Sequence, residues 1–276
     1  MLWPTWPGLS IWPADRAAVD GMEMPAQRLA RRYWLCLLGL GPWVRSDAAA
    51  AELIVGVEGT YPPFNFQGGD GTLQGYEVEF GRALAARMGR QLRFVTLPWA
   101  SLLAALPAHR VDLVINHLMP TPERRRRLDF SHPYTVSGIV VLTRPDLSGK
   151  IHGMADLAGR RVGAAMGSYY EQWLRTQQPK AIVVLYPSLE LGLRDLEIGR
   201  FDAIVNDELV AADLLRKGLQ LRIVAPPSTR DLESAVAMAR NRPQLLQQVD
   251  AAIDAIRADG TLRELSLRWF GRDTTP

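Results

Sequence analysis

From residue 52 onwards, short apolar runs alternate with longer segments in which apolar residues recur every third or fourth position. The short runs predict strands, and the longer spacing predicts helices. The expected strands cover residues 52–57, 91–96, 111–115, 137–143, 161–165, 181–185, 202–206, 220–224 and 234–239. The expected helices cover residues 76–88, 99–107, 122–127, 169–177, 188–198, 208–216, 242–258 and 261–269. Because strands alternate with helices, the pattern is typical of parallel strands joined by helical crossovers, which predicts an α/β fold.

One segment, residues 118–134, combines a helix start with a run of arginines. Thr121 suits an N-cap position, Pro122 the first helical position, and Glu123 the positive end of the helix dipole. Arg124 would then lie among unpaired backbone N–H groups, and a guanidinium in that setting suits a carboxylate. A capped surface helix with solvated arginines would give the same pattern, so this segment alone leaves both interpretations open.

The N-terminal part of the chain has the order of a targeting sequence. Residues 27–32 are positively charged, residues 33–44 are apolar, and residues 48–51 are small. This order predicts a signal peptide and an exported, periplasmic product, and the apolar run is too short to span a membrane. An N-terminal core helix is the alternative interpretation.

Two further features belong to this leader. The only cysteine, Cys36, follows Tyr-Trp-Leu rather than small residues, so we do not expect a lipoprotein anchor. The preceding residues 1–21 show little periodicity, and we expect translation to begin at Met22 or Met24.

Composition narrows the function classes. The chain has 276 residues, 47% of them hydrophobic, and a formal net charge of +3, so a sizeable core is available and the charge is modest. Zinc-finger spacing, aromatic RNA-binding motifs and a basic helical stripe are all missing from the sequence, which argues against nucleic-acid binding. Neither a G-x-S-x-G motif nor metal-ligand spacing occurs, so we expect no cofactor and no metal.

A set of motifs, taken in order, resembles the family 3 periplasmic solute-binding proteins of the amino-acid ABC transporter type. The resemblance spans residues 52–271. It rests on residues 53–66 (LIVGVEGTYPPFNF), 75–81 (GYEVEFG), 98–99 (PW), 121–124 (TPER), 129–134 (DFSHPY), 259–262 (DGTL) and 268–271 (RWFG).

The resemblance implies a two-lobe periplasmic-binding-protein fold. Each lobe would be a mixed, mostly parallel sheet flanked by helices, and two crossover strands would join the lobes. We expect residues 1–51 to form an N-terminal extension plus signal peptide, 52–142 and 234–273 the first lobe, and 146–228 the second. The crossings are expected at residues 143–146 and 226–231, which are rich in proline and small polar residues.

The resemblance also places candidate ligand-binding residues in the first lobe. Aromatic side chains at Tyr61 and Trp99 would sandwich the ligand, although Tyr61 could plug its own core and Trp99 could be a hydrophobic staple. Glu58 would reach a polar tail of the ligand, and Arg124 would take its carboxylate.

Residues 116–119 follow an expected strand and would also line the site. The family commonly offers a small hydroxyl residue where Met119 stands, and methionine is at best a weak acceptor. Asn116 and His117 are its neighbours in this segment. A lone histidine is often structural, so His117 is open to both a structural and a ligand-binding interpretation.

Second-lobe candidates come from two strand ends. Ser168 and Glu171 have the spacing of a capping box, and Tyr169 stands where the family often has threonine. Asp207 ends the strand at 202–206; the resemblance implies that it takes the ligand's ammonium, and a helix-cap role is the alternative.

The resemblance, with these residues at its motif positions, implies a protein that binds a small amino-acid-like or carboxylate solute by hinge closure and delivers it to an ABC importer. We expect a monomer that docks transiently on the membrane permease and is not an enzyme. One alternative is a dehydratase-like enzyme acting on a small cyclic organic acid, with Glu58, His117 and Asp207 as acid–base groups. Another is a sensory or accessory binding protein without a transporter.

Overall fold

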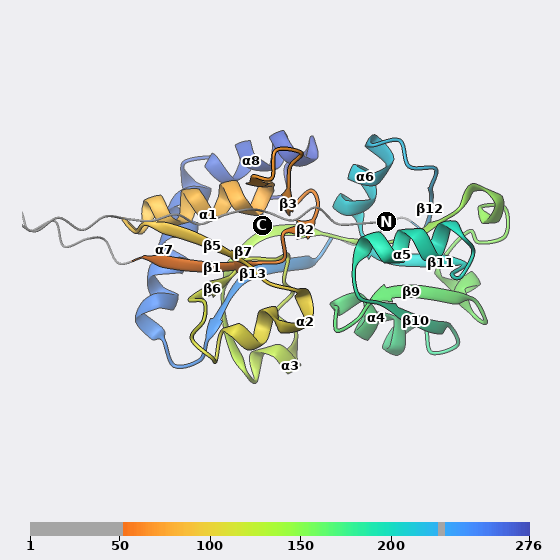
Figure 1. Ribbon diagram of the computed structural model, residues 1–276, viewed down its shortest axis with the longest axis horizontal. Coiled ribbons are helices and arrows are strands. Elements are labelled where there is room, and N and C mark those ends of the chain that lie inside the picture. The colour runs from red at the N-terminus through yellow and green to blue at the C-terminus, as the bar shows by residue number, and fades with distance from the viewer. Residues whose placement is uncertain (1–51, 226–229) are drawn as a thin grey trace, which may run out of the picture. The chain divides into compact units, whose positions relative to one another are not determined.

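Two five-stranded sheets organise the computed structural model, which describes residues 52–225 and 230–276 (Figure 1). The sheet of the first lobe has the order β5-β1-β6-β13-β7, with strands Leu92–Thr96, Leu53–Val57, Leu113–Val114, Leu232–Ala239 and Leu128–Ser137. The sheet of the second lobe has the order β10-β9-β11-β8-β12, with strands Ile182–Tyr186, Arg161–Ala165, Ala203–Asp207, Ile139–Thr143 and Arg222–Ala225. The two-lobe α/β fold expected from the sequence is therefore confirmed.

Both sheets mix parallel and antiparallel pairs for the same reason. Strand β1 runs parallel to β5 and β6, and β9 runs parallel to β10 and β11, as helical crossovers require. The antiparallel pairs involve β13 in the first sheet and β8 in the second. These strands lie next to the two passages of the chain between the sheets, so they run against their neighbours.

Helices cover the sheets close to where periodicity places them. In the first lobe they are α1 (Tyr76–Arg87), α2 (Trp99–Leu102, continued by a 3-10 turn at Leu103–Ala105), α3 (Pro122–Arg125), α7 (Pro243–Ala258) and α8 (Thr261–Phe270). In the second lobe they are α4 (Tyr169–Gln177), α5 (Leu189–Glu197), α6 (Glu208–Arg216) and 3-10 turns at Pro145–Leu147 and Met154–Leu157. None of the helices in the described part of the chain is long and apolar enough to cross a membrane.

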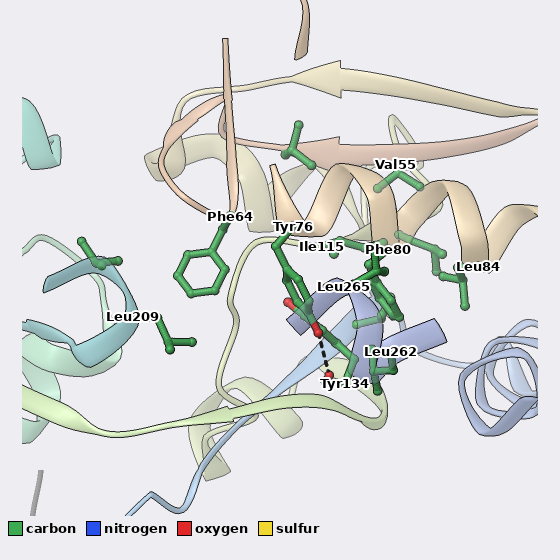
Figure 2. Packing of buried hydrophobic residues seen from close by; sticks show 14 of the residues in the cluster. Val55, Phe64, Tyr76, Phe80, Leu84, Ile115, Tyr134, Leu209, Leu262 and Leu265 are labelled. Carbon is green, nitrogen blue, oxygen red and sulfur yellow. Dashed lines mark hydrogen bonds between the residues drawn. The ribbon is translucent and has the colours of Figure 1, made fainter. Parts of the chain in front are cut away.

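The core of the first lobe is built on aromatic side chains from α1 and β7. Phe80 stacks on Tyr134 with ring centroids 4.5 Å apart, and the Tyr76 hydroxyl donates to the Tyr134 carbonyl at 3.0 Å (Figure 2). Leu262 and Leu265 of α8 pack into the same cluster, which fixes the C-terminal helix against the start of the lobe.

Phe64 lies in a turn of a small three-stranded sheet and packs into this core. Its strands are β2 (Thr60–Tyr61), β3 (Asn65–Gln67) and β4 (Leu73–Gln74). The turn at Phe64 sits directly on the start of α1, because a Cβ on Gly75 would lie 2.2 Å from the Phe64 carbonyl oxygen. Gly75 also has a φ of 129°, so only glycine permits this close approach.

Strand β7 and the small sheet were not predicted. The β7 segment contains Pro133 and several polar residues, so it lacks the apolar alternation that indicates a strand. It forms a strand because it pairs with β13, with irregular register on either side of Ala235, and because Ser131, Thr135 and Ser137 are buried. Strand β7 therefore forms because it pairs with β13, which is distant in the sequence, and its own residue pattern does not indicate a strand.

The predicted lobe boundaries are wrong at the first crossing. The chain leaves the first sheet at Ser137 and enters the second at Ile139, so the crossing lies at Gly138. Residues 139–142, assigned to the first lobe, belong to β8 of the second sheet, because their backbone pairs with β11 and β12. Residues 143–146 end β8 and begin a 3-10 turn instead of crossing.

The return to the first sheet lies between Ala225 and Leu232. Residues 226–229 of the predicted second crossing, and the predicted leader at 1–51, lie outside the described residues.

Candidate functional site

A pocket lies between the two lobes, where strand ends of the two sheets face each other. Every residue predicted from the sequence to bind the ligand lines this pocket, except Asp207. These residues are Glu58, Tyr61, Trp99, Asn116, His117, Met119, Arg124, Ser168 and Tyr169. The lining also includes residues that were not predicted from the sequence: Ala165, Tyr170, Tyr186, Pro187, Ser188, Leu189 and Asn206.

Two sequence signals could have found most of the missed residues. Tyr170 and Asn206 are the immediate neighbours of two predicted residues. Tyr186 is the last residue of β10 and residues 187–189 follow it, and β10 is parallel to β9. Because the carboxyl ends of parallel strands meet at one edge of a sheet, the loops after β9 and β10 reach the same place.

Arg124 is a partly buried cation in the pocket wall. Thr121 caps α3 by accepting from the Arg124 amide at 3.2 Å, as its sequence predicted. The guanidinium donates to the Met119 carbonyl at 2.9 Å and to the Gly167 carbonyl of the second lobe at 3.2 Å. It also lies over the Trp99 ring, 5.6 Å from the centroid.

Arg124 remains without a carboxylate partner among the described residues. Burial lowers the pKa of Arg124 to about 10, against the opposing influence of Glu123. A guanidinium carries more N–H donors than its two carbonyl partners use, so the side chain can still bind an anion.

Glu58 is the carboxylate of the pocket wall, directly after β1. Its amide donates to Asn116 Oδ1 at 2.7 Å, and its Oε1 accepts from the Thr60 hydroxyl at 3.1 Å. Burial raises the pKa of the Glu58 carboxyl, and hydrogen bonds from Thr60 and Asn116 only partly oppose this. A carboxylate in this setting gains stability from a nearby cation.

Tyr61 and Trp99 connect the lobes. The Tyr61 hydroxyl donates to Asn206 Oδ1 at 3.1 Å, and Trp99 Nε1 donates to the Met166 carbonyl at 2.8 Å. Both acceptors belong to the second lobe. The two aromatic side chains therefore bridge the lobes around the pocket, and their stacking on a ligand stays a prediction.

Asn116, Ser168 and Met119 hold the pocket wall in place. Asn116 Oδ1 accepts from Asn65 Nδ2 at 3.0 Å as well as from the Glu58 amide. Ser168 caps α4 by accepting from the Glu171 amide at 3.2 Å, as its spacing predicted. Met119 packs with the apolar cluster that contains second-lobe core residues.

Asp207 lies behind the pocket wall and is 0% exposed. Its Oδ2 accepts from the Ser137 hydroxyl at 2.5 Å and from the Tyr170 hydroxyl at 3.2 Å, and lies 2.9 Å from His117 Nε2. Its Oδ1 caps α6 by accepting from the Leu209 amide at 2.7 Å. Burial raises the pKa of Asp207, but the charge and hydrogen bonds of its partners outweigh burial and leave it below the ordinary value.

His117 stands between the pocket and Asp207, and the first lobe holds it firmly. Its backbone, at a φ of 45°, directs the amide to the Glu77 carboxylate and to the Tyr134 hydroxyl, 3.2 Å away. The ring stacks on Phe64 with centroids 3.9 Å apart, and Nδ1 lies 3.0 Å from the Ser234 hydroxyl. The structure thus brings His117 of the first lobe to Asp207 of the second.

A metal centre finds no support in the described part of the chain, where no three His, Cys, Asp or Glu side chains gather as ligands. The pocket offers instead one cation, one carboxylate, a histidine and several aromatic rings between two lobes. Such an arrangement can hold a small polar solute without changing it.

Comparisons with known proteins agree with this geometry. The chain is 42% identical over 223 residues to the L-cystine-binding protein TcyJ of Escherichia coli (strain K12), covering 81% of this chain and 84% of the relative. It is 31% identical over 228 residues to the ABC transporter arginine-binding protein 1 of the same strain, covering 81% and 93%.

Solved structures show the same fold. An ancestral arginine-binding protein bound to glutamine matches with a TM-score of 0.75 and 28% identity, covering 80% of this chain and 99% of that one. The ancestral amino acid-binding protein AncCDT-1, a precursor of cyclohexadienyl dehydratase, matches with a TM-score of 0.72 and 30% identity, covering 80% and 95%.

A family model describes nearly the whole two-lobe part of the chain, residues 53–272. The match covers both sheets and the pocket between them. By fold, by pocket and by this match, the chain belongs to the bacterial extracellular solute-binding proteins, family 3.

Proposed function

We propose that this solute-binding protein carries a small amino acid and hands it to the membrane permease of an ABC importer. One observation supports this most: Arg124 and Glu58 are the residues with full charges in the pocket lining, and each lacks an ion-pair partner among the described residues. An amino acid brings both a carboxylate and a cation, so it can satisfy both side chains at once.

The proposed ligand binds with its carboxylate at Arg124 and a cationic group at Glu58. L-cystine is the first candidate, because the relative at 42% identity is named for it. L-arginine is the second, since its guanidinium could also pair with Glu58. The lining is otherwise largely aromatic and aliphatic, which suits a sulfur-containing or long aliphatic side chain.

Delivery follows from closure of the lobes. The inter-lobe hydrogen bonds of Tyr61, Trp99 and Arg124 surround the pocket, so a ligand between the lobes adds to contacts that already join them. A permease can then distinguish the closed from the open form. The protein acts as a monomer that meets the permease transiently.

A thermal-shift screen of purified protein tests the ligand class. L-cystine and L-arginine are compared with small dicarboxylates that lack an amine. A bound amino acid at 100 times its Kd is expected to stabilise the protein by about 2.7 kcal/mol. Stabilisation by amine-free carboxylates alone would contradict the proposal.

Enzyme activity is the second candidate function, favoured by one observation. Ser234, His117 and Asp207 form a chain of polar contacts, with 3.0 Å between Ser234 Oγ and His117 Nδ1 and 2.9 Å between His117 Nε2 and Asp207 Oδ2. Both Ser234 and Asp207 are 0% exposed and outside the pocket lining, so the hydroxyl cannot attack a bound solute. We therefore favour binding without turnover, and incubation of the protein with candidate ligands, followed by product analysis, separates the two.

Export is proposed from the sequence of the leader, which lies outside the described residues. Cleavage is expected near Ala51, so that the mature chain begins just before β1. N-terminal sequencing of the exported protein checks this, and a mature N-terminus well before Ala48 would contradict it.

A further inference from the structure

The Asp207 carboxylate already has its partners inside the protein. Both oxygens accept hydrogen bonds, and the side chain is 0% exposed. A buried carboxylate without a cation is costly, so a partner of opposite charge matters here more than at the surface. In the described part of the chain, the side chain that can supply this charge is His117, whose Nε2 lies 2.9 Å from Asp207 Oδ2 and which is a cation only when protonated.

His117 also separates Asp207 from any ligand. His117 belongs to the lining of the pocket, whereas Asp207 does not. The His117 ring and the Tyr170 hydroxyl are the groups of the pocket lining that contact the Asp207 carboxylate, and a ligand cation that took the place of the imidazole would have to displace this ring. Displacement is opposed by the stacking on Phe64, by the contact with Ser234 and by the amide bonds to Glu77 and Tyr134.

A ligand cation that entered beside His117 would meet a second obstacle. It would compete with the imidazole for one carboxylate whose lone pairs are already shared with Ser137, Tyr170 and the Leu209 amide. The Glu58 carboxylate belongs to the lining of the same pocket, and its side-chain donors, Thr60 and Asn116, are neutral. Of the two carboxylates, Glu58 is the one that a ligand can reach and that still lacks a cation.

We propose that His117 is a specificity-determining residue: its imidazole occupies the cation-binding side of Asp207, so the amine of the ligand is recognised by Glu58 instead. The Asp207–His117 pair then joins the two lobes behind the pocket. In the first lobe, Glu58 binds the amine of the ligand and Arg124 binds its carboxylate. This inference rests on the proposed amino-acid ligand and names which carboxylate of the site recognises the amine.

The measurement is a preference ratio obtained by titration calorimetry. L-cystine is paired with the analogue in which hydrogen replaces each α-amino group, so that no other cation is left on the ligand, and the ratio of the two Kd values gives the preference for the amine. Glu58→Gln keeps the size of the side chain and removes its charge. We expect Glu58→Gln to lower the preference about tenfold or more, because a charge-assisted hydrogen bond is lost.

Asp207→Asn is the matched variant, with the same change of charge behind the pocket wall. It is expected to leave the preference within about twofold of wild type, whatever it does to stability or to overall affinity. A preference abolished by Asp207→Asn and unchanged by Glu58→Gln would overturn the inference. If Asp207→Asn fails to fold, Glu58→Gln alone still decides, because an unchanged preference in that variant contradicts the assignment.

His117→Gln adds a test of the histidine itself. Without the imidazole, Asp207 becomes reachable, so in the His117→Gln background Asp207→Asn should lower the preference although it does not do so in wild type. Additive effects of the two substitutions would contradict the role of His117. Equal binding of amino acids and amine-free analogues by the wild-type protein is a different outcome, and it would count against the proposed function as a whole.

Discussion

Arg124→Ala is expected to weaken ligand binding by about 2 kcal/mol or more, which is roughly 30-fold in Kd. The side chain lines the pocket, lacks a carboxylate partner among the described residues, and has its pKa lowered to about 10 by burial. A ligand carboxylate would relieve that cost through charge-assisted hydrogen bonds. Titration calorimetry with the amino acid identified in the thermal-shift screen measures the loss.

Arg126→Ala is the control for this prediction. Arg126 is exposed at the C-terminal end of α3, outside the pocket, and belongs to the same arginine run. Its removal is expected to change Kd by less than about twofold, as is usual for surface substitutions. Equal small losses in both variants would show that Arg124 is a surface residue and that the run is simply solvated.

Glu77→Ala is expected to lower the free energy of unfolding by about 4 kcal/mol. Glu77 is 0% exposed in the first turn of α1, and its carboxylate accepts from Asn65 Nδ2 at 2.7 Å, from the Tyr134 hydroxyl and from the His117 amide. The alanine variant would remove the shared acceptor of three buried donors, of which the His117 amide keeps the Tyr134 hydroxyl at 3.2 Å, and each buried donor left without an acceptor costs about 1–3 kcal/mol. Urea denaturation followed by circular dichroism measures the change.

Glu79→Ala provides the matched control on the same helix. Glu79 pairs at 2.6 Å with Arg268, and both side chains are partly exposed to solvent. Such a surface pair contributes at most about 1 kcal/mol. If the two alanine variants lost equal stability, the buried acceptor role of Glu77 would be refuted.

Local sequence decided most of the secondary structure and much of the pocket lining. Caps such as Thr121 and Ser168 act within three residues, so spacing alone located the starts of α3 and α4. The pocket residues follow strand ends, and the carboxyl ends of parallel strands gather at one edge of a sheet. Together with the family resemblance, these strand ends allowed Glu58, Asn116 and Ser168 to be proposed before any contact was known.

Elements that depend on distant partners could not be predicted in this way. Strand β7 lacks apolar alternation, and its backbone is paired only because β13, about a hundred residues later, lies beside it. The same holds for Glu77. Its place on α1 was expected, but its role as acceptor for the His117 amide depends on a contact across 40 residues.

Asp207 shows most clearly which properties follow from the local sequence and which depend on contacts between distant residues. The sequence by itself determined that an aspartate ends a buried strand and begins a helix, because strand burial and helix capping depend on neighbours along the chain. Whether that carboxylate faces a ligand depends on what fills the space in front of it. Only the tertiary structure decided this, by placing His117 from the other lobe, 90 residues earlier in the chain, at 2.9 Å from Asp207.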